Sequence, residues 1–219
     1  MNVGFLHVGT DPTLAQIMVD SVKRQMPGVG IMQMTDEVTP AVAGVDIVKR
    51  MPYTDGRLMT YRLEHLAALP NGHWLILDTD VIVQRDVSWI IQTMYPAKVA
   101  LTRRTGVILG PGGVNIVELM PFNTGVMFAK DPEFFRRCAM HCRTLPDHQQ
   151  RWWGDQLSVK YVVDSGFHVA ELSCDDFNYS PNSKEEDVSE KALVHYKGNR
   201  KEWLREMYGS FPAAVNGGE

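Results

Sequence analysis

A ten-residue stretch in the first half of the chain, residues 74–83, constrains the fold most strongly. It has the sequence WLILDTDVIV: four apolar residues, two carboxylates one residue apart, and then further apolar, mostly β-branched residues. A short apolar run rich in branched residues is typical of a strand buried on both faces of a sheet. Polar residues at the end of such a strand lie where open α/β sheets bind ligands. We therefore predict that Asp78 and Asp80 leave the core together at a ligand-binding edge.

This acidic pair has two interpretations. Two carboxylates at one strand end are hard oxygen ligands for Mg²⁺ or Mn²⁺, and such an ion keeps positions open for water and phosphate oxygens. The same spacing also fits a turn or a helix cap, and Asp86 could itself cap the next helix. The pair alone does not decide between these interpretations, so other motifs in the chain are needed to choose between them.

The N-terminal part of the chain has the pattern of a βαβ unit. Residues 3–8 and 30–35 are predicted to be strands, and between them a helix begins at Thr10 or Asp11, followed by Pro12 at its first turn. Strand, helix and strand at this spacing indicate a sheet that is at least partly parallel.

The remaining pattern alternates in the same way and contains neither a repeat nor a linker. Residues 106–113 are rich in glycine and residues 174–190 are polar and acidic, so we expect two surface loops there. We expect an α/β fold in one domain over residues 1–210, with a flexible tail at 211–219. The other expected elements are helices over 55–69 and 87–95, from Asp131 onward and up to about Val163, and strands over 98–102, 122–129, 167–172 and 192–196.

Composition excludes several classes of function. The 219 residues, of which 44% are hydrophobic, suffice for one sizeable core, and the formal net charge of −4 argues against a generic nucleic-acid sheath or a polybasic membrane anchor. No segment has the length of a membrane span, and the N-terminus lacks the basic start and cleavage site of a signal peptide. We therefore expect a cytoplasmic protein with small-molecule partners.

The three cysteines predict reduced thiols, because an odd number does not make a disulfide framework. Cys138, His141 and Cys142 are residue types that bind metals. However, Phe134 and Phe135 precede them at helical spacing, which favours a buried helix face over a metal site.

Five motifs follow one another along the chain in an order that resembles the family 8 retaining glycosyltransferases, the group that includes glycogenin and bacterial lipooligosaccharide galactosyltransferases. The resemblance covers most of residues 3–203 and implies a Rossmann-like GT-A fold, with a central mixed, mostly parallel sheet flanked by helices. The motifs are YRLEHL with Arg62, the D-x-D at residues 78–80, FNTGV at 122–126, WGDQL at 153–157 and HYKGNRKEW at 195–203.

The last motif is the most specific. The family pattern H-x-x-G-x-x-K-x-W is filled here by His195, Gly198, Lys201 and Trp203. An imidazole can complete a metal site begun by two carboxylates, a glycine lets the backbone approach a diphosphate, and a lysine neutralises it. Standing alone, the segment would equally fit a strand followed by a solvated basic helix.

The resemblance implies a role for each matching residue. It implies that Asp78, Asp80 and His195 bind Mn²⁺ or Mg²⁺ and that this ion contacts the diphosphate of a nucleotide sugar. The match near the nucleotide base is loose, so the base is open, and uridine is only the usual choice of the family. The implied donor-binding residues are His7, Thr10, Arg62, Asp78, Thr79, Asn123, Thr124, Asp155, Gln156, Gly198 and Lys201.

The implied activity is transfer of a hexose, glucose or galactose, from a nucleotide diphosphate sugar to an acceptor hydroxyl with retention of configuration. A double displacement would use Asp155 or Gln156 as the catalytic nucleophile, whereas a same-face attack needs only a diphosphate oxygen as base. The second is favoured, because an amide is a poor nucleophile.

Two other classes of function remain open, a nucleotidyltransferase and a non-catalytic binding module. A nucleotidyltransferase would be expected to have a basic, glycine-rich phosphate loop after the first strand, and GTDPT at residues 9–13 has no basic residue. The acceptor is open among a saccharide, a glycolipid, a protein and a modified nucleic acid. Trp152 and Trp153 are either a stacking platform for a sugar or base, or packing residues.

Overall fold

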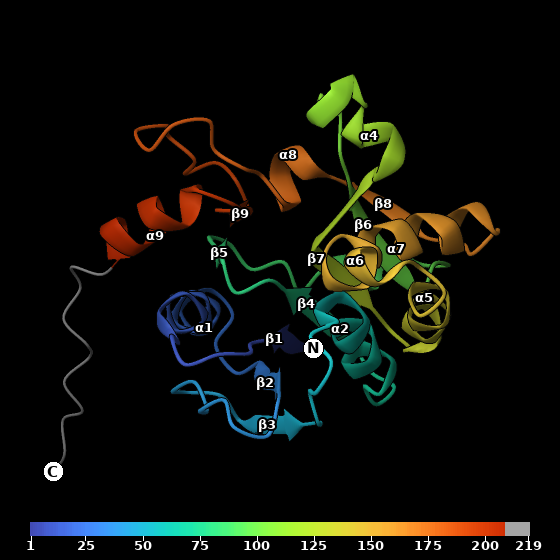
Figure 1. The fold of residues 1–219 in the computed structure, drawn as a ribbon. Coiled ribbons are helices and arrows are strands. Elements are labelled where there is room, and N and C mark those ends of the chain that lie inside the picture. Colours follow the sequence, from blue (N-terminus) through green and yellow to red (C-terminus); the bar gives the residue numbers. More distant parts are fainter. Residues whose placement is uncertain (209–219) are drawn as a thin grey trace, which may run out of the picture.

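The fold is built on a seven-stranded sheet with the order β3-β2-β1-β4-β7-β6-β8 (Figure 1). The computed structural model describes residues 1–208, so the tail expected at 211–219 lies outside the described residues; the single domain expected over 1–210 stays a prediction. Only β7 runs antiparallel to its neighbours. The strands are β1 (Asn2–Leu6), β2 (Gly30–Thr35), β3 (Ile47–Arg50), β4 (Trp74–Leu77), β6 (Val99–Arg103), β7 (Phe122–Ala129) and β8 (Ala170–Ser173).

Helices cover both faces of this sheet. Alternate residues of β4 show the division: Leu75 and Leu77 pack in the cluster that contains α1, while Trp74 and Ile76 pack in the cluster that contains α2, α5 and α7. All four side chains are buried, as the apolar run predicts, and the expected mixed, mostly parallel α/β sheet is confirmed. The helices are α1 (Thr13–Gln25), α2 (Leu58–Ala67), α3 (Ile90–Thr93), α4 (Ile116–Leu119), α5 (Glu133–Cys142), α6 (Asp147–Arg151), α7 (Gly154–Asp164), α8 (Cys174–Phe177), α9 (Arg200–Tyr208) and the 3₁₀ turn Pro111–Gly113.

The first strand of the central apolar run ends directly before the acidic pair, as predicted. β4 ends at Leu77, the amide of Val81 donates to the carbonyl of Asp78 across 3.2 Å, and the chain turns there. It then enters β5 (Val81–Val83), which pairs antiparallel with β9 (Leu193–His195) in a separate two-stranded sheet. Val81 lies opposite His195, so this turn sets the C-terminal segment beside the acidic pair.

Several local predictions were inaccurate. The sequence pattern missed β3, a short and only partly buried edge strand, and missed α6. The segment 174–190 is not simply a solvated loop, because it begins with α8 and buries Asn178. Within residues 1–208, no helix combines the length and apolarity that crossing a bilayer requires.

Candidate active site

The two acidic residues and a histidine meet where the two sheets join. Asp78 and Asp80 lie in the turn between β4 and β5, and His195 ends β9. His195 Nε2 lies 3.1 Å from Asp80 Oδ1 and 3.7 Å from Asp78 Oδ2. One ligand atom from each of the three side chains lies within 4.8 Å of the others, the single such group of His, Cys, Asp and Glu in the described part of the chain. Residues far apart in sequence thus form one potential coordination site.

A buried amide orients the histidine ring. Asn178 Oδ1 lies 2.8 Å from His195 Nδ1, and the amide is fixed this way round because its nitrogen donates to Thr102 Oγ1 at 2.7 Å and to the Asn123 carbonyl at 3.1 Å. The ring therefore donates through Nδ1, and its Nε2 faces the two carboxylates. Sequence reasoning missed Asn178, because the acidic residues around it suggested a solvated loop.

Gly125 makes room for the same ring. A Cβ at this position would lie 2.3 Å from His195 Cε1 and 2.5 Å from Nδ1. Real Cβ atoms essentially never come so close, so any larger residue in the FNTGV motif would push the imidazole away. The glycine of this motif is thus explained by the position of His195.

The donor set fits Mn²⁺ or Mg²⁺. Two carboxylates and an imidazole suit such ions, and Asp78 is 35% exposed, so the cluster is open to solvent and substrate. Lys201 Nζ lies 3.3 Å from Asp80 Oδ2. Burial raises the pKa of Asp80, but His195 and Lys201 outweigh it and hold the pKa well below its ordinary value. Asp80 is therefore a carboxylate near neutral pH, as a metal ligand must be.

Arg62 joins the cluster to a second buried carboxylate. Its guanidinium donates to Asp78 at 2.7 Å, to Asp155 at 2.6 Å and to the Thr124 carbonyl at 2.8 Å. Burial opposes the charge of Arg62, but the two carboxylates outweigh it and raise its pKa. Thr124 Oγ1 also donates to Asp155 at 2.8 Å. The buried guanidinium thus fixes Asp78 from the side opposite His195, and its predicted contact with a donor stays a prediction.

Asp155 and Gln156 are brought to the same region by the start of α7. The Gln156 backbone amide donates to Asp155 Oδ1 at 2.8 Å, and the Gln156 side-chain oxygen accepts from Arg104 at 2.6 Å. Arg104 also donates to the Phe122 carbonyl at 2.7 Å, and sequence reasoning did not identify it. The sequence feature that could have pointed to Arg104 is its position one residue after the end of β6.

The remaining predicted donor residues surround this edge of the sheet. Phe5 of β1 pairs with Leu77 of β4, so His7 and Thr10 follow β1 on the side where Asp78 follows β4. His7 Nε2 is buried and has no hydrogen-bond partner in the described part of the chain. Thr79 lies in the turn between the acidic residues, and the exposed Gly198 has a φ of +64° that favours glycine. Their roles in binding stay predictions.

A cavity of about 170 Å³ adjoins the cluster. It is lined by residues of the two large loops, 106–113 and 174–190, among them Asn178, and also by Asn123 and Lys197. The exposed tryptophans lie elsewhere: Trp152 is 59% and Trp153 45% exposed, and their stacking role stays a prediction.

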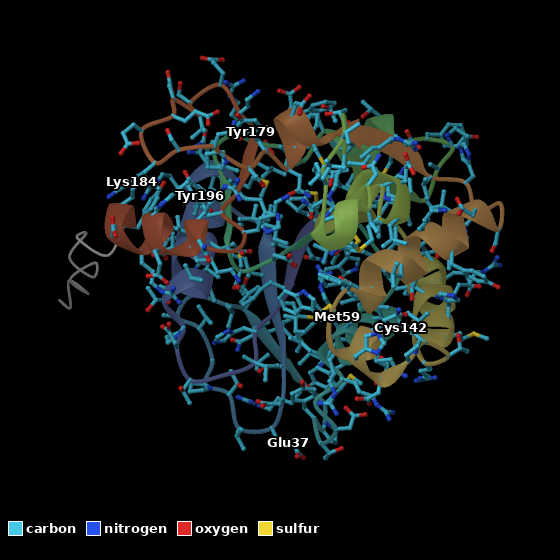
Figure 2. The ribbon with its side chains drawn as sticks, turned by 45° about the horizontal axis from the view of Figure 1, so that its top comes forward. Glu37, Met59, Cys142, Tyr179, Lys184 and Tyr196 are labelled. Atoms are coloured by element: carbon cyan, nitrogen blue, oxygen red, sulfur yellow. The ribbon has the colours of Figure 1, made fainter. Side chains whose placement is uncertain are left out.

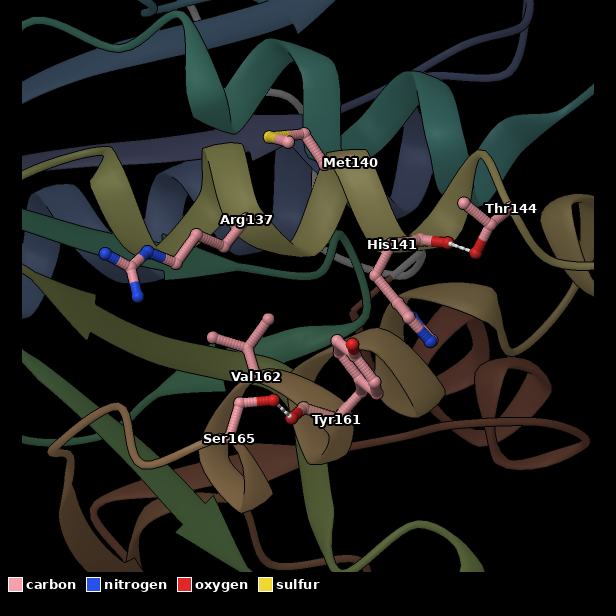
Figure 3. Close-up of a pocket in the computed structure, with 7 residues that line it drawn as sticks. All are labelled: Arg137, Met140, His141, Thr144, Tyr161, Val162 and Ser165. Atoms are coloured by element: carbon pink, nitrogen blue, oxygen red, sulfur yellow. Dashed lines mark hydrogen bonds between the residues drawn. The ribbon is translucent and has the colours of Figure 1, made fainter.

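A larger hollow of about 350 Å³ lies between α5 and α7, away from the acidic pair (Figure 3). His141 lines it, stacks on Tyr161 and contacts Ser158 Oγ through Nδ1 at 3.0 Å. The neighbouring thiols of Cys138 and Cys142 are buried, and burial raises their pKa. Figure 2 shows Cys142 on the opposite side of the view from Tyr196, which follows His195. This helix face therefore belongs to the core and not to the acidic cluster.

Three glycosyltransferases of known structure share this fold. Galactosyltransferase LgtC, solved with donor and acceptor sugar analogs, has a TM-score of 0.62 and 13% identity over 99% of this chain and 98% of its own. A glycosyltransferase involved in the glycosylation of the major capsid of PBCV-1 has a TM-score of 0.61 and 18% identity over 94% and 100%. Glycosyltransferase GlyE of Streptococcus pneumoniae TIGR4 has a TM-score of 0.58 and 15% identity over 93% of this chain and 60% of its own.

At these identities the likeness establishes the fold, and the GT-A fold expected from the sequence motifs is confirmed. No protein-family model matches the sequence, and no protein of curated function matches it.

Proposed function

We propose that this protein is a metal-dependent retaining glycosyltransferase that moves a hexose from a nucleotide diphosphate sugar to an acceptor hydroxyl. We expect uridine as the base and glucose or galactose as the hexose. The observation that carries the proposal is the cluster of Asp78, Asp80 and His195 at the strand ends of a GT-A sheet. A cytoplasmic location remains part of the proposal.

The cluster supplies ligands for Mn²⁺ or Mg²⁺, which when bound stabilises negative charge on the departing diphosphate. The chain's own groups add to this effect. Lys201 lies beside Asp80, where its ammonium can bind phosphate oxygens, and Arg62 holds Asp78 in place. Electrostatic stabilisation of this kind is commonly the largest catalytic contribution.

The surroundings of Asp155 support a same-face attack. Its carboxylate already accepts hydrogen bonds from Arg62, Thr124 and the Gln156 amide, and only 3% of the residue is exposed. A carboxylate held by three donors is a weak nucleophile, and the Gln156 amide is weaker still. We propose that Asp155 positions Arg62 and Thr124, and that a diphosphate oxygen of the donor takes the acceptor proton.

A thermal-shift panel of nucleoside diphosphates, with and without Mn²⁺, tests the proposal. We expect UDP to raise the melting temperature only with the metal, because ligands that bind the native state stabilise it by mass action. Asp80→Asn should abolish this shift, while Asp86→Asn, an exposed carboxylate outside the cluster, should preserve it. Metal-dependent binding that survives in Asp80→Asn would refute the site.

Product analysis separates the alternative functions. Incubation with a UDP-hexose and Mn²⁺ should release UDP as the hexose is transferred to water or to an acceptor. A nucleotidyltransferase would instead release pyrophosphate from a nucleoside triphosphate and a sugar phosphate. A non-catalytic binding module would bind the donor without turning it over.

A further inference from the structure

The cavity beside the cluster contains polar groups that have no hydrogen-bond partner among residues 1–208. Asn123 is 5% exposed, and its amide nitrogen has no hydrogen-bond partner. The Ser180 hydroxyl oxygen is also buried without a partner. Both residues line the cavity. Buried polar atoms are normally paired, and leaving one unpaired costs about 1–3 kcal/mol, so unpaired donors around a hollow indicate a polar ligand.

The cavity also holds positive charge that is not neutralised. Lys197 and Arg104 line it, and no ion pair involves either residue within 1–208. Arg104 donates only to uncharged acceptors, the Met120 and Phe122 carbonyls and the Gln156 side chain. Burial, followed by the charge of Arg104, lowers the pKa of Lys197.

One carboxylate, the exposed Asp175, also lines the cavity. Two cations and one carboxylate leave the cavity wall with a formal charge of +1. Burial raises the pKa of the Cys174 thiol in the same wall, which keeps this group neutral. A negatively charged ligand would therefore complement the cavity.

The place of the cavity favours the acceptor over the donor. Both large loops contribute to its wall, with Ile108 from the first and Tyr179 and Asn182 from the second. Loops of this kind commonly carry the specificity of a rigid scaffold. Asn178 joins the two sites, since it lines the cavity and contacts His195. A ligand in the cavity would thus lie next to the proposed site of transfer.

We propose that this cavity is the acceptor subsite and that it takes a saccharide bearing a negative charge, either a carboxylate or a phosphate ester. The inference rests on the proposed function and names its acceptor class. Lys197 and Arg104 bind the charged group, while Asn123 and Ser180 bind sugar hydroxyls. The volume, about 170 Å³, has room for a sugar-sized group that displaces several waters.

Calorimetry with matched sugars tests the proposal. The probes are 4-nitrophenyl glucuronide and glucose 6-phosphate against 4-nitrophenyl glucoside and glucose, each with and without UDP and Mn²⁺. We expect the charged sugars to bind at least about tenfold more tightly than the neutral ones, because a hydrogen bond between charged groups is stronger. Lys197→Gln should remove this preference, Lys197→Arg should retain it, and Lys98→Gln, an exposed lysine of β6's N-terminal flank, should leave it intact.

The other possible outcomes separate an acceptor role of the cavity from a donor role. Equal binding of charged and neutral sugars, or a preference that survives in Lys197→Gln, would overturn the proposal. If Lys197→Gln instead weakens UDP binding and leaves sugar binding unchanged, Lys197 serves the donor diphosphate, and the acceptor subsite is wrong. If UDP fails to bind the wild type with Mn²⁺, the proposed glycosyl transfer fails, while the sugar measurements without nucleotide still judge the charge preference of the cavity.

Discussion

Replacing Gly125 with alanine tests whether the position of His195 creates the metal site. The new methyl group would lie 2.3 Å from His195 Cε1 and 3.1 Å from Asp78 Oδ2. Normal carbon contacts are about 3.5–4.0 Å, so the ring must move by roughly 1.2–1.7 Å or the strand must shift. β7 is buried along its whole length and is hydrogen-bonded on both sides, so we expect the ring to move.

Two effects of different size should follow. Overpacking of a filled interior costs about 1–3 kcal/mol, which for a chain of this length lowers the melting temperature by roughly 2–12 °C. Displacing the ring also separates Nδ1 from Asn178, now 2.8 Å away. Loss of such a partner costs about 10–100-fold in metal affinity. The affinity for Mn²⁺ should therefore fall even under conditions in which the small loss of folding stability leaves the variant fully folded.

The assay is calorimetric titration of Mn²⁺ at a temperature where the variant is fully folded by circular dichroism. Gly4→Ala is the matched control, because it adds the same methyl group within the same sheet, but the nearest atom, Ile76 Cδ1, lies 3.3 Å away and not 2.3 Å. It should bind Mn²⁺ like the wild type. Wild-type Mn²⁺ affinity in folded Gly125→Ala would refute the assignment of His195 as a ligand.

Two further predictions concern Asn178 and His65. Asn178→Ala removes the partner of His195 Nδ1, so Mn²⁺ affinity measured by titration should fall about 10–100-fold, and urea unfolding should show a loss of about 1–3 kcal/mol from the unpaired buried groups. Unchanged affinity would show that the ring is oriented without this amide. His65 is fully buried, and burial, followed by the charge of Lys49, lowers its pKa to about 4. The folded ring stays neutral while the unfolded ring takes up a proton below about pH 6.5, so the free energy of unfolding should fall by about 2 kcal/mol between pH 7 and pH 5. His65→Leu should lose this dependence in urea titrations at the two pH values, and an equal slope in both proteins would contradict the burial argument.

The sequence predicted those parts of the fold that local pattern determines. β2 and β7 have the expected bounds, and α1 follows Asp11-Pro12, as a cap followed by proline indicates. Only the family resemblance predicted that Asp78, Asp80 and His195 form one site, because no sequence periodicity links residues so far apart in the chain. The structure places them within ligand distance of one another.

The missed features depend on tertiary contacts that composition does not reveal. The sequence does not show where the apolar residues after the acidic pair go, because the pairing of Val81 with His195, which places β5 in a second sheet, joins residues far apart in the chain. Asn178 follows two aspartates that suggest a solvated segment, but its side chain is buried by β6, β7 and His195. Arg104 has no pattern of its own, and its importance comes from the carbonyls that it contacts.

The break in the central apolar run has a consequence for how the protein is assembled. β4 receives its neighbours from the first two thirds of the chain, whereas β5 has only β9 as a strand partner within residues 1–208. A nascent polypeptide that stops before His195 could still pair the seven strands of the main sheet, but it would lack the third ligand atom. Competence to hold a cation would therefore be acquired only after β9 has been made and has paired with β5.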